Sequence, residues 1–321
     1  MRYLVTGGAG FIGSNTVDEL VRRGHGVVVL DDLSSGKEEN LADIRNKITF
    51  MKGSITDLET VQKAMLQAEF VIHLAARTSV PRSVKDPLDT NRINVDGTLN
   101  VLLAARDNKV KRVVFAASSS AYGETPALPK TEDMQPFPIS PYGVSKYVGE
   151  LYAQAFQRCY GLECVSLRYF NIFGPRQDPD SPYSGVLSRF ATAFLDDGQP
   201  LVYGDGEQTR DFTFVENAVQ ANLLACEAPG AFGKVFNVGT GSRVSLNHTL
   251  ELLRTISGKN LQAKYEAPRD GDIRDSQAEI RSARDILGYE PTVFFEEGLR
   301  RTYDWYRAHH AKEAPRKPDI R

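Results

Sequence analysis

Features that would tie a protein to a membrane, a disulfide framework or nucleic acid are scarce in this sequence. Three cysteines (Cys159, Cys164 and Cys226) occur in 321 residues. No two of them form a C-x-x-C pair, so neither a disulfide framework nor a metal site is expected. No apolar run approaches the roughly 20 residues of a membrane helix. The formal net charge of −2 gives no electrostatic reason to bind nucleic acid or a membrane. We therefore expect a soluble protein of the reducing cytoplasm.

The composition that remains is that of an ordinary globular enzyme. Hydrophobic residues make up 41% and charged residues 25% of the chain, and both values are typical of soluble domains. The length allows one large domain or two unequal ones.

Strand-like and helix-like segments alternate along the first half of the chain. Short apolar runs predict strands, and apolar residues at helical spacing predict the helices between them. The strands are expected at 3–5, 27–30, 48–51, 70–74, 112–116 and 164–168, and the helices at 11–23, 57–66, 89–107 and 141–160. This rhythm predicts an α/β fold, with a Rossmann-type doubly wound parallel sheet over residues 1–174.

The rhythm ends in a loop rich in Pro, Asp, Ser and Gly at Gly174–Ser184. Further helices are expected near 185–196, 216–227, 246–257 and 294–308, with short strands between them. We interpret residues 175–310 as a smaller, mixed α/β lobe that binds the substrate, with some segments returning to the sheet. Residues 311–321, which carry two prolines among charged residues, are predicted to be a disordered tail.

A glycine-rich turn follows the first predicted strand and opens the first predicted helix. It reads Gly8-x-Gly10-x-x-Gly13, a spacing that lets backbone N–H groups approach a pyrophosphate at a helix N-terminus. A strand-to-helix turn without a ligand is the alternative interpretation. The flanking strand and helix, which the motif requires, favour a dinucleotide site.

The second predicted strand ends at Asp31, which lies 18 positions after Gly13. An acidic residue about 20 positions after the glycines binds the adenine ribose in such sheets. Its carboxylate would repel a 2′-phosphate, and no Lys or Arg follows before Lys37. The sequence therefore favours NAD over NADP, the alternative being a solvated aspartate in a turn.

Tyr142 and Lys146 are four residues apart in the predicted helix 141–160, so they share one face of it. An ammonium near the phenol favours the phenolate, and we expect it to lower the pKa of Tyr142 towards neutrality. Tyr142 then becomes a candidate general base for a sugar hydroxyl. The serine run 118–120 ends the fifth predicted strand, on the side where such sheets bind ligands. One of these hydroxyls could bind the same oxygen, or the run could be a polar turn.

These features together resemble the extended short-chain dehydrogenase/reductases of the NAD-dependent epimerase/dehydratase type, and most closely the UDP-hexose 4-epimerases. The resemblance extends over about residues 1–310 and rests on TGGAGFIG (6–13), GSITD (53–57), HLAA (73–76), SPYGVSK (140–146), RYFNIFGP (168–175), TRDF (209–212) and PRDGD (268–272). Where the family more commonly has Asp in the second of these segments, this chain has Ser54.

The resemblance implies roles for individual residues. It implies contacts to NAD by Gly7, Gly10, Phe11, Ile12, Gly13, Asp31, Ser54, Ile55, Leu74, Ala75, Ala76, Asn94, Tyr142, Lys146 and Tyr169. It implies catalytic roles for Ser118, Tyr142 and Lys146, and contacts to a UDP-sugar by Ser118, Ser119, Tyr142, Asn171, Arg210, Arg269, Asp272 and Ser276. Arginines suit the diphosphate, because the guanidinium is always charged and binds in a bidentate manner.

The implied reaction is epimerisation at C4 of the sugar. Tyr142 would take the proton of the 4-hydroxyl while the C4 hydride passes to NAD⁺. The resulting 4-keto sugar would turn over before the hydride returns. Ser118 would bind the same oxygen, and Lys146 would bind the nicotinamide ribose. The dehydratases and decarboxylases of the family carry a Glu beside the serine position, whereas this chain has Ser119, Ser120 and Ala121 there.

The sugar itself is less closely defined. Ser276 occupies a position where a bulky aromatic residue is typical of family members restricted to UDP-glucose and UDP-galactose. A small residue leaves room for an acetamido group, so turnover of UDP-GlcNAc and UDP-GalNAc is expected as well. A UDP-uronic acid remains an alternative, and a non-catalytic NAD-binding sensor is the alternative from another functional class.

The resemblance also implies a homodimer. In the family, two helices of each subunit form a four-helix bundle, and the matching segments here are 89–107 and 141–160. Apolar residues of the second segment could serve either the core or this interface: Val148, Leu151, Tyr152, Ala155 and Phe156.

Overall fold

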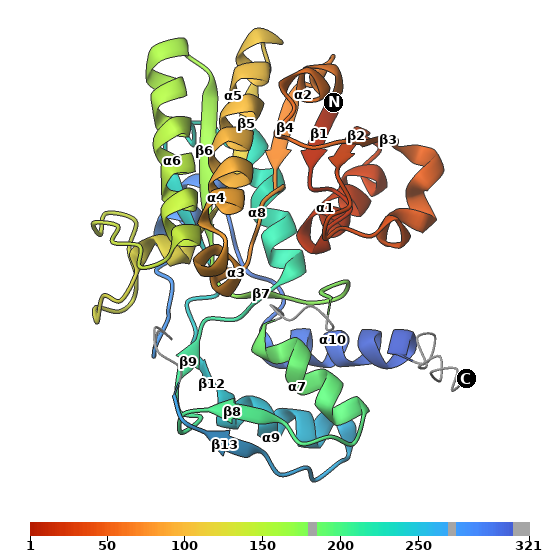
Figure 1. Ribbon diagram of the computed structural model, residues 1–321, viewed down its shortest axis with the longest axis vertical. Coiled ribbons are helices and arrows are strands. Elements are labelled where there is room, and N and C mark those ends of the chain that lie inside the picture. Colours follow the sequence, from red (N-terminus) through yellow and green to blue (C-terminus); the bar gives the residue numbers. More distant parts are fainter. Residues whose placement is uncertain (179–184, 269–273, 311–321) are drawn as a thin grey trace.

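A seven-stranded parallel sheet forms the centre of the protein in the computed structural model (Figure 1), which describes residues 1–178, 185–268 and 274–310. Across the sheet the strands are β11 (Val235–Val238), β6 (Glu163–Tyr169), β5 (Arg112–Ser118), β4 (Phe70–His73), β1 (Arg2–Thr6), β2 (Gly26–Asp31) and β3 (Thr49–Lys52). All neighbouring strands are parallel. The predicted Rossmann-type sheet is thus confirmed, and a strand from the C-terminal half completes it.

Helices cover both faces of this sheet. One layer consists of α1 (Phe11–Arg22) and α8 (Val215–Glu227), and the other of α2 (Leu58–Met65), α5 (Gly97–Asp107) and α6 (Pro141–Tyr160). Tyr3 and Val5 of β1 pack in the first core, whereas Leu4 packs in the second. Burial on both faces explains why these strands are continuously apolar. Within the described residues, no helix is both long and apolar enough to cross a membrane.

The single helix expected over 89–107 is divided into three segments. α4 (Pro87–Asn91) is followed by a π-helical turn at Arg92–Asp96, and α5 then continues the helix. A π turn inserts one extra residue per turn, and such turns occur frequently at functional sites. Other elements were not predicted, among them the short helix α3 (Val80–Lys85) and a 3-10 segment at Glu38–Lys47.

A smaller lobe lies beside the carboxyl ends of the strands (Figure 1). It consists of α7 (Val186–Leu195), β8 (Leu201–Tyr203), β9 (Thr209–Arg210), β12 (Val244–Ser245), α9 (Leu246–Ser257), β13 (Lys264–Glu266) and α10 (Phe295–His310), and it is joined to the sheet through β7 (Ile172–Phe173) and β10 (Thr213–Phe214). Four phenylalanines pack at this junction, with ring centroids of Phe173 5.7 Å from Phe214 and 5.6 Å from Phe295, and Phe212 stacked on Phe295 at 5.1 Å. The two parts therefore share one core.

The order of the strands reverses between β1 and β4. From β1 the chain passes outwards to β2 and β3, and then returns to the other side of β1 as β4. In sheets of this kind, the reversal opens a crevice at the carboxyl ends of the two central strands. The glycine loop leaves β1 at this point, and the lobe lies across from it.

Candidate active site

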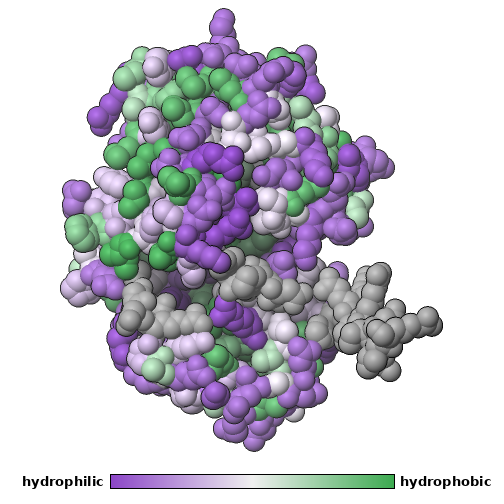
Figure 2. Space-filling view, in the orientation of Figure 1, coloured by the Kyte–Doolittle hydropathy of each residue, from purple (hydrophilic) through white to green (hydrophobic). Residues whose placement is uncertain are grey.

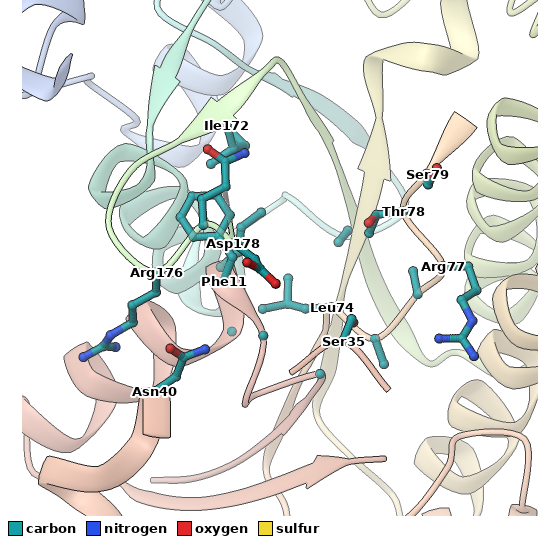
Figure 3. A pocket seen from close by; sticks show the side chains of 18 of the residues that line it. Phe11, Ser35, Asn40, Leu74, Arg77, Thr78, Ser79, Ile172, Arg176 and Asp178 are labelled. Carbon is teal, nitrogen blue, oxygen red and sulfur yellow. The ribbon is translucent and has the colours of Figure 1, made fainter. Parts of the chain in front are cut away.

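The crevice is a cavity of about 1580 Å³ between the sheet and the lobe. Figure 3 shows Leu74 and Ser35 near its centre, with Arg77 and Arg176 on opposite sides. Most of the predicted site residues line it: Gly7, Gly10, Phe11, Ile12, Gly13, Asp31, Ile55, Leu74, Ala75, Ala76, Ser118, Ser119, Tyr142, Lys146, Tyr169 and Asn171. Of the predicted residues that the structure describes, Ser54, Asn94, Arg210 and Ser276 do not line it.

The glycine loop is built for close backbone approach. Gly7 has a φ of +69°, and a Cβ on Gly13 would lie 2.0 Å from the carbonyl oxygen of Gly7. α1 begins after Gly10 without a side-chain cap, so its first N–H groups are available to a phosphate. The tight backbone packing that excludes a Cβ at Gly13, together with this uncapped helix end, fits the pyrophosphate of NAD.

Asp31 holds the loop and faces the cavity. Its Oδ2 accepts the N–H of Ala9 at 2.9 Å, and its Oδ1 accepts the N–H of Leu33 at 2.8 Å. Burial raises the pKa of this carboxyl group, and the two backbone bonds oppose the rise. Each oxygen keeps a second lone pair, which can accept a ribose hydroxyl. This geometry fits the role in NAD binding that the sequence predicts for Asp31.

His73 at the end of β4 connects the core to the cavity wall. Thr98 donates its hydroxyl hydrogen to the carbonyl of Asn94 at 2.6 Å. The Nε2 of His73, 3.0 Å from the same hydroxyl oxygen, must therefore carry a hydrogen and donate. Nδ1 then accepts from Thr6, at 2.7 Å, and the Thr6 oxygen accepts the N–H of Ala75 at 3.3 Å. A neutral imidazole thus helps to fix the backbone at Ala75, which lines the cavity.

Asn94 acts through the backbone of Arg77. Its Oδ1 accepts the N–H of Arg77 at 2.7 Å, and its Nδ2 donates to the carbonyl of Arg77 and to the hydroxyl of Ser145, both at 3.0 Å. The π turn directs this side chain inwards, since Asn94 is buried. Arg77 in turn donates to Ser34 and to Asp89. Asn94 therefore joins the segment after β4 to α6, a role that the sequence did not reveal.

Tyr142 lies in the first turn of α6, which Ser140 caps by accepting the N–H of Gly143 at 3.1 Å. Burial raises the pKa of Tyr142, and its hydrogen bond to Ser118 opposes the rise. The expectation that Lys146 would lower this pKa is wrong for the structure, because the net direction is upwards and burial dominates. The structure does bring the phenol and the Ser118 hydroxyl together, as the sequence predicts.

The ammonium of Lys146 is buried between α6 and the sheet. It donates to the carbonyl of Ala116 at 2.7 Å and lies 5.1 Å from the centre of the Phe115 ring. Burial lowers the pKa of Lys146 to about 8, and the carboxylate of Glu150 opposes the fall. α6 can approach the sheet this closely because residue 149 is glycine; a Cβ there would lie 2.3 Å from Cζ of Phe115.

At the other end of the cavity, Asn171 and Ser276 meet. The Nδ2 of Asn171 donates to the carbonyl of Asp211 at 3.1 Å and to the hydroxyl of Ser276 at 3.3 Å. Asp211 is buried, and its carboxylate accepts from Thr240, from Gly241 and, at 3.0 Å, from the N–H of Ala278. Burial raises the pKa of Asp211, and these bonds oppose the rise. The sequence did not single out Asp211, yet it holds three segments at this end of the cavity together.

The remaining predicted residues lie away from the cavity or outside the described residues. The Oγ of Ser54 is 2.9 Å from the hydroxyl of Thr56. Arg210 donates from Nη1 to the carbonyls of Thr209 and Arg274, at 2.9 Å and 2.8 Å. Arg269, Asp272 and the tail 311–321 lie outside the described residues.

A segment after β7 crosses the mouth of the cavity. Arg176 forms an ion pair with Asp18 of α1 at 2.6 Å, and Asp178 lies 3.6 Å from Lys37. Both Arg176 and Asp178 are visible in Figure 3. The Arg176 ion pair thereby attaches the segment leading into the lobe to α1, the helix that follows the glycine loop. Sequence patterns did not predict this attachment, because the partners are far apart in the chain.

Comparisons with known proteins agree with this geometry. The family model for the "NAD dependent epimerase/dehydratase family" matches residues 3–239. A UDP-glucose 4-epimerase of Mycolicibacterium smegmatis is 42% identical over 96% of this chain and 99% of its own length. The crystal structure of a UDP-glucose 4-epimerase with UDP-glucose from Thermotoga maritima has a TM-score of 0.92 at 42% identity, and the match covers 97% of this chain and 100% of the other. A UDP-N-acetylglucosamine 4-epimerase from Methanobrevibacter ruminantium, in complex with UDP-N-acetylmuramic acid, has the same TM-score at 41% identity, with 96% and 98% covered.

The neutral His73 leads to a prediction about stability and pH. Burial, and secondarily the charge of Lys146, lowers the pKa of His73 from 6.5 to about 3. Below pH 6.5 the unfolded chain binds a proton at this residue and the folded chain does not, so stability falls as the pH falls. Between pH 7 and pH 5 this costs about 2 kcal/mol. We expect His73→Gln to lack that part of the pH dependence, measured by urea unfolding at both pH values.

The exposed His248, replaced by Gln, serves as the control for loss of a histidine. If the wild type and His73→Gln lose the same amount of stability between pH 7 and pH 5, the result contradicts a neutral, buried imidazole at His73.

Proposed function

The chain belongs to the NAD-dependent epimerase/dehydratase family, and from that premise we propose that it is a UDP-hexose 4-epimerase. It interconverts UDP-glucose with UDP-galactose, and UDP-GlcNAc with UDP-GalNAc. The observation that carries the proposal is the convergence of Tyr142, Ser118 and Lys146 on the cavity that the glycine loop also lines. The two similar epimerases named for these sugars, which match along nearly their full length, support it.

Each catalytic side chain has one task in this reaction. Tyr142 takes the proton of the sugar 4-hydroxyl as general base and later returns it. Ser118, which is hydrogen-bonded to Tyr142, binds the same oxygen. Lys146, one helical turn further on, lines the same cavity and would bind the nicotinamide ribose of the cofactor. The glycine loop and Asp31 would hold NAD⁺ in the same cavity, where it would supply a hydride acceptor for reversible oxidation at C4 of the sugar.

The sugar end of the cavity supports a wide substrate range. Ser276 contacts Asn171, which lines the cavity, and its small side chain leaves room for an acetamido group. A UDP-uronic acid is the alternative substrate, and an assay with UDP-glucuronic acid beside the four UDP-hexoses distinguishes the two. A non-catalytic NAD sensor would not need the tyrosine, serine and lysine in one cavity, so we favour an enzyme.

Tyr142→Phe tests the reaction. The purified wild type, once denatured, should release NAD, and the native protein should convert UDP-galactose to UDP-glucose. Removal of the phenolic hydroxyl should lower kcat about 10²- to 10⁴-fold, the usual contribution of a general base. NAD should be retained. Tyr160→Phe, at the exposed end of the same helix, is the matched control. NAD release without turnover of any UDP-sugar by the wild type would favour the sensor.

Ser276→Tyr tests the substrate range. A phenol ring beside Asn171 would fill the space for the acetamido group, so kcat/KM for UDP-GlcNAc should fall by at least about 10-fold. The value for UDP-galactose should stay close to that of the wild type, and Ser276→Ala should preserve both activities. Absence of activity on either N-acetylated sugar in the wild type would refute the wide range.

We also propose that the protein is a homodimer through α5 and α6. The structure separates core from surface on α6, because Phe156 is buried whereas Leu151, Val144 and Ala155 are exposed. Figure 2 shows apolar side chains gathered on the face where Figure 1 places α6. An apolar helix face of this kind is typical of an interface.

Sedimentation equilibrium tests the dimer. The wild type should sediment as a dimer, and Leu151→Glu as a monomer, because a charge would be buried at the interface. Leu66→Glu, at an exposed leucine beyond the end of α2, should remain dimeric. A monomeric wild type at micromolar concentration would refute the proposal.

A further inference from the structure

Lys146 is a buried cation, and some of the groups around it attract its charge while others repel it. Glu150 follows it by one turn on α6 and attracts it. The carbonyl of Ala116 accepts its hydrogen bond. His73 of β4 is close enough for a repulsive interaction if it were protonated. Other titratable groups on the neighbouring elements include Tyr142 of α6, Arg168 and Tyr169 of β6, and Tyr122, whose ring lies against Arg168. Among these side chains, Glu150 is therefore the one whose charge holds a proton on Lys146.

Glu150 is itself held by Arg168. The guanidinium donates from Nε to Oε1 at 2.9 Å and from Nη2 to Oε2 at 2.7 Å, a bidentate pair. The two side chains are only 1% and 3% exposed, respectively. Arg168 lies opposite Ala117 on the neighbouring strand, one residue from the carbonyl that Lys146 binds. The ion pair and the lysine thus occupy the same space between α6 and the sheet.

Few other polar partners hold Arg168. Its Nη1 has no hydrogen-bond acceptor among the described residues, and its guanidinium lies 4.5 Å from the centre of the Tyr122 ring. Desolvating two charges costs several kcal/mol each, and a hydrophobic pair of similar volume is often as stable. Stability alone therefore gives little reason for an ion pair here, whereas a fixed negative charge beside Lys146 gives a functional one.

We propose that Glu150, oriented by Arg168, is a positioning residue that keeps Lys146 protonated in the buried active site. Burial raises the pKa of Glu150, and Arg168 and Lys146 oppose the rise; the carboxylate stays ionised because its neutral form would leave Arg168 as an uncompensated buried charge. Burial alone favours neutral lysine, and a neutral amine would leave no positive charge in this part of the proposed active site. The functional reason for this charge rests on the proposed function. The charge itself can be measured without turnover.

Titration of Lys146 by NMR tests the inference. In protein labelled with ¹³C at lysine Cε, the Lys146 signal is identified by its loss in Lys146→Met. Wild type should titrate near the pKa of about 8. In Glu150→Gln the attraction is lost and Arg168 is unmasked, so the midpoint should fall by at least about one unit. The basic limb of the pH profile of kcat/KM should move down by the same amount.

Glu163→Gln is the matched control. Glu163 forms an ion pair with Arg112 at 2.6 Å at the other end of β6, is 32% exposed, and lies far from Lys146 in the sheet register. Its loss should leave the Lys146 midpoint unchanged. A purely structural role for Glu150 predicts reduced stability in Glu150→Gln but the wild-type midpoint and basic limb.

A second variant covers the case in which Glu150→Gln does not fold. Glu150→Gln combined with Arg168→Met removes both charges and leaves none uncompensated. Its Lys146 midpoint should lie below that of the wild type, by less than in the single variant, because the repulsion from Arg168 is also gone. A folded variant with the wild-type midpoint overturns the inference. Wild type that titrates as expected but turns over no UDP-sugar contradicts the proposed function and leaves the inference standing.

Discussion

Burial of one ammonium group imposes constraints on much of this active site. Lys146 must lie beneath α6 to reach the cavity, and an unpaired charge in such a place is costly. Gly149 allows the helix to approach the ring of Phe115, and the carbonyl of Ala116 accepts from the ammonium. Glu150 supplies the opposite charge. These features lie on two adjacent elements, so the geometry of the helix on the sheet and the charge state of the lysine are parts of one arrangement.

His73 is neutral for two reasons. Burial lowers its pKa, and repulsion from the nearby charge of Lys146 lowers it further. Thr6 and Thr98 satisfy both ring nitrogens, so the imidazole stays buried in its neutral form. Thr6 also accepts the N–H of Ala75. The neutral His73 therefore helps, through Thr6, to position the backbone of Ala75 in the cavity wall.

Local sequence patterns predicted the parts of the fold that depend on local chemistry. The strands of the first half, the glycine loop and the Tyr142–Lys146 spacing follow from periodicity and from motif context. The role of Asn94, the bonds of Asp211 and the seventh strand β11 depend on partners far away in the chain, which periodicity does not reveal. The pKa of Tyr142 could not be inferred from spacing either, because it is set mainly by burial, which raises it. Arg269 and Asp272 stay predictions.

The two ends of the cavity differ in how they are built. The cofactor end rests on strand ends and on the start of α1, which the parallel sheet holds rigidly. At the opposite end, Asp211 holds the segments at 240–241 and 278, and the fully buried Asn237 of β11 accepts from Tyr122 at 2.6 Å and donates to the carbonyls of Lys130 and Glu279. Ser276 reaches this end through its contact with Asn171, whereas Tyr142 is positioned by α6 and its Ser140 cap. In the proposed reaction, a change of size at residue 276 would therefore alter the space for the sugar while α6 keeps Tyr142 in place.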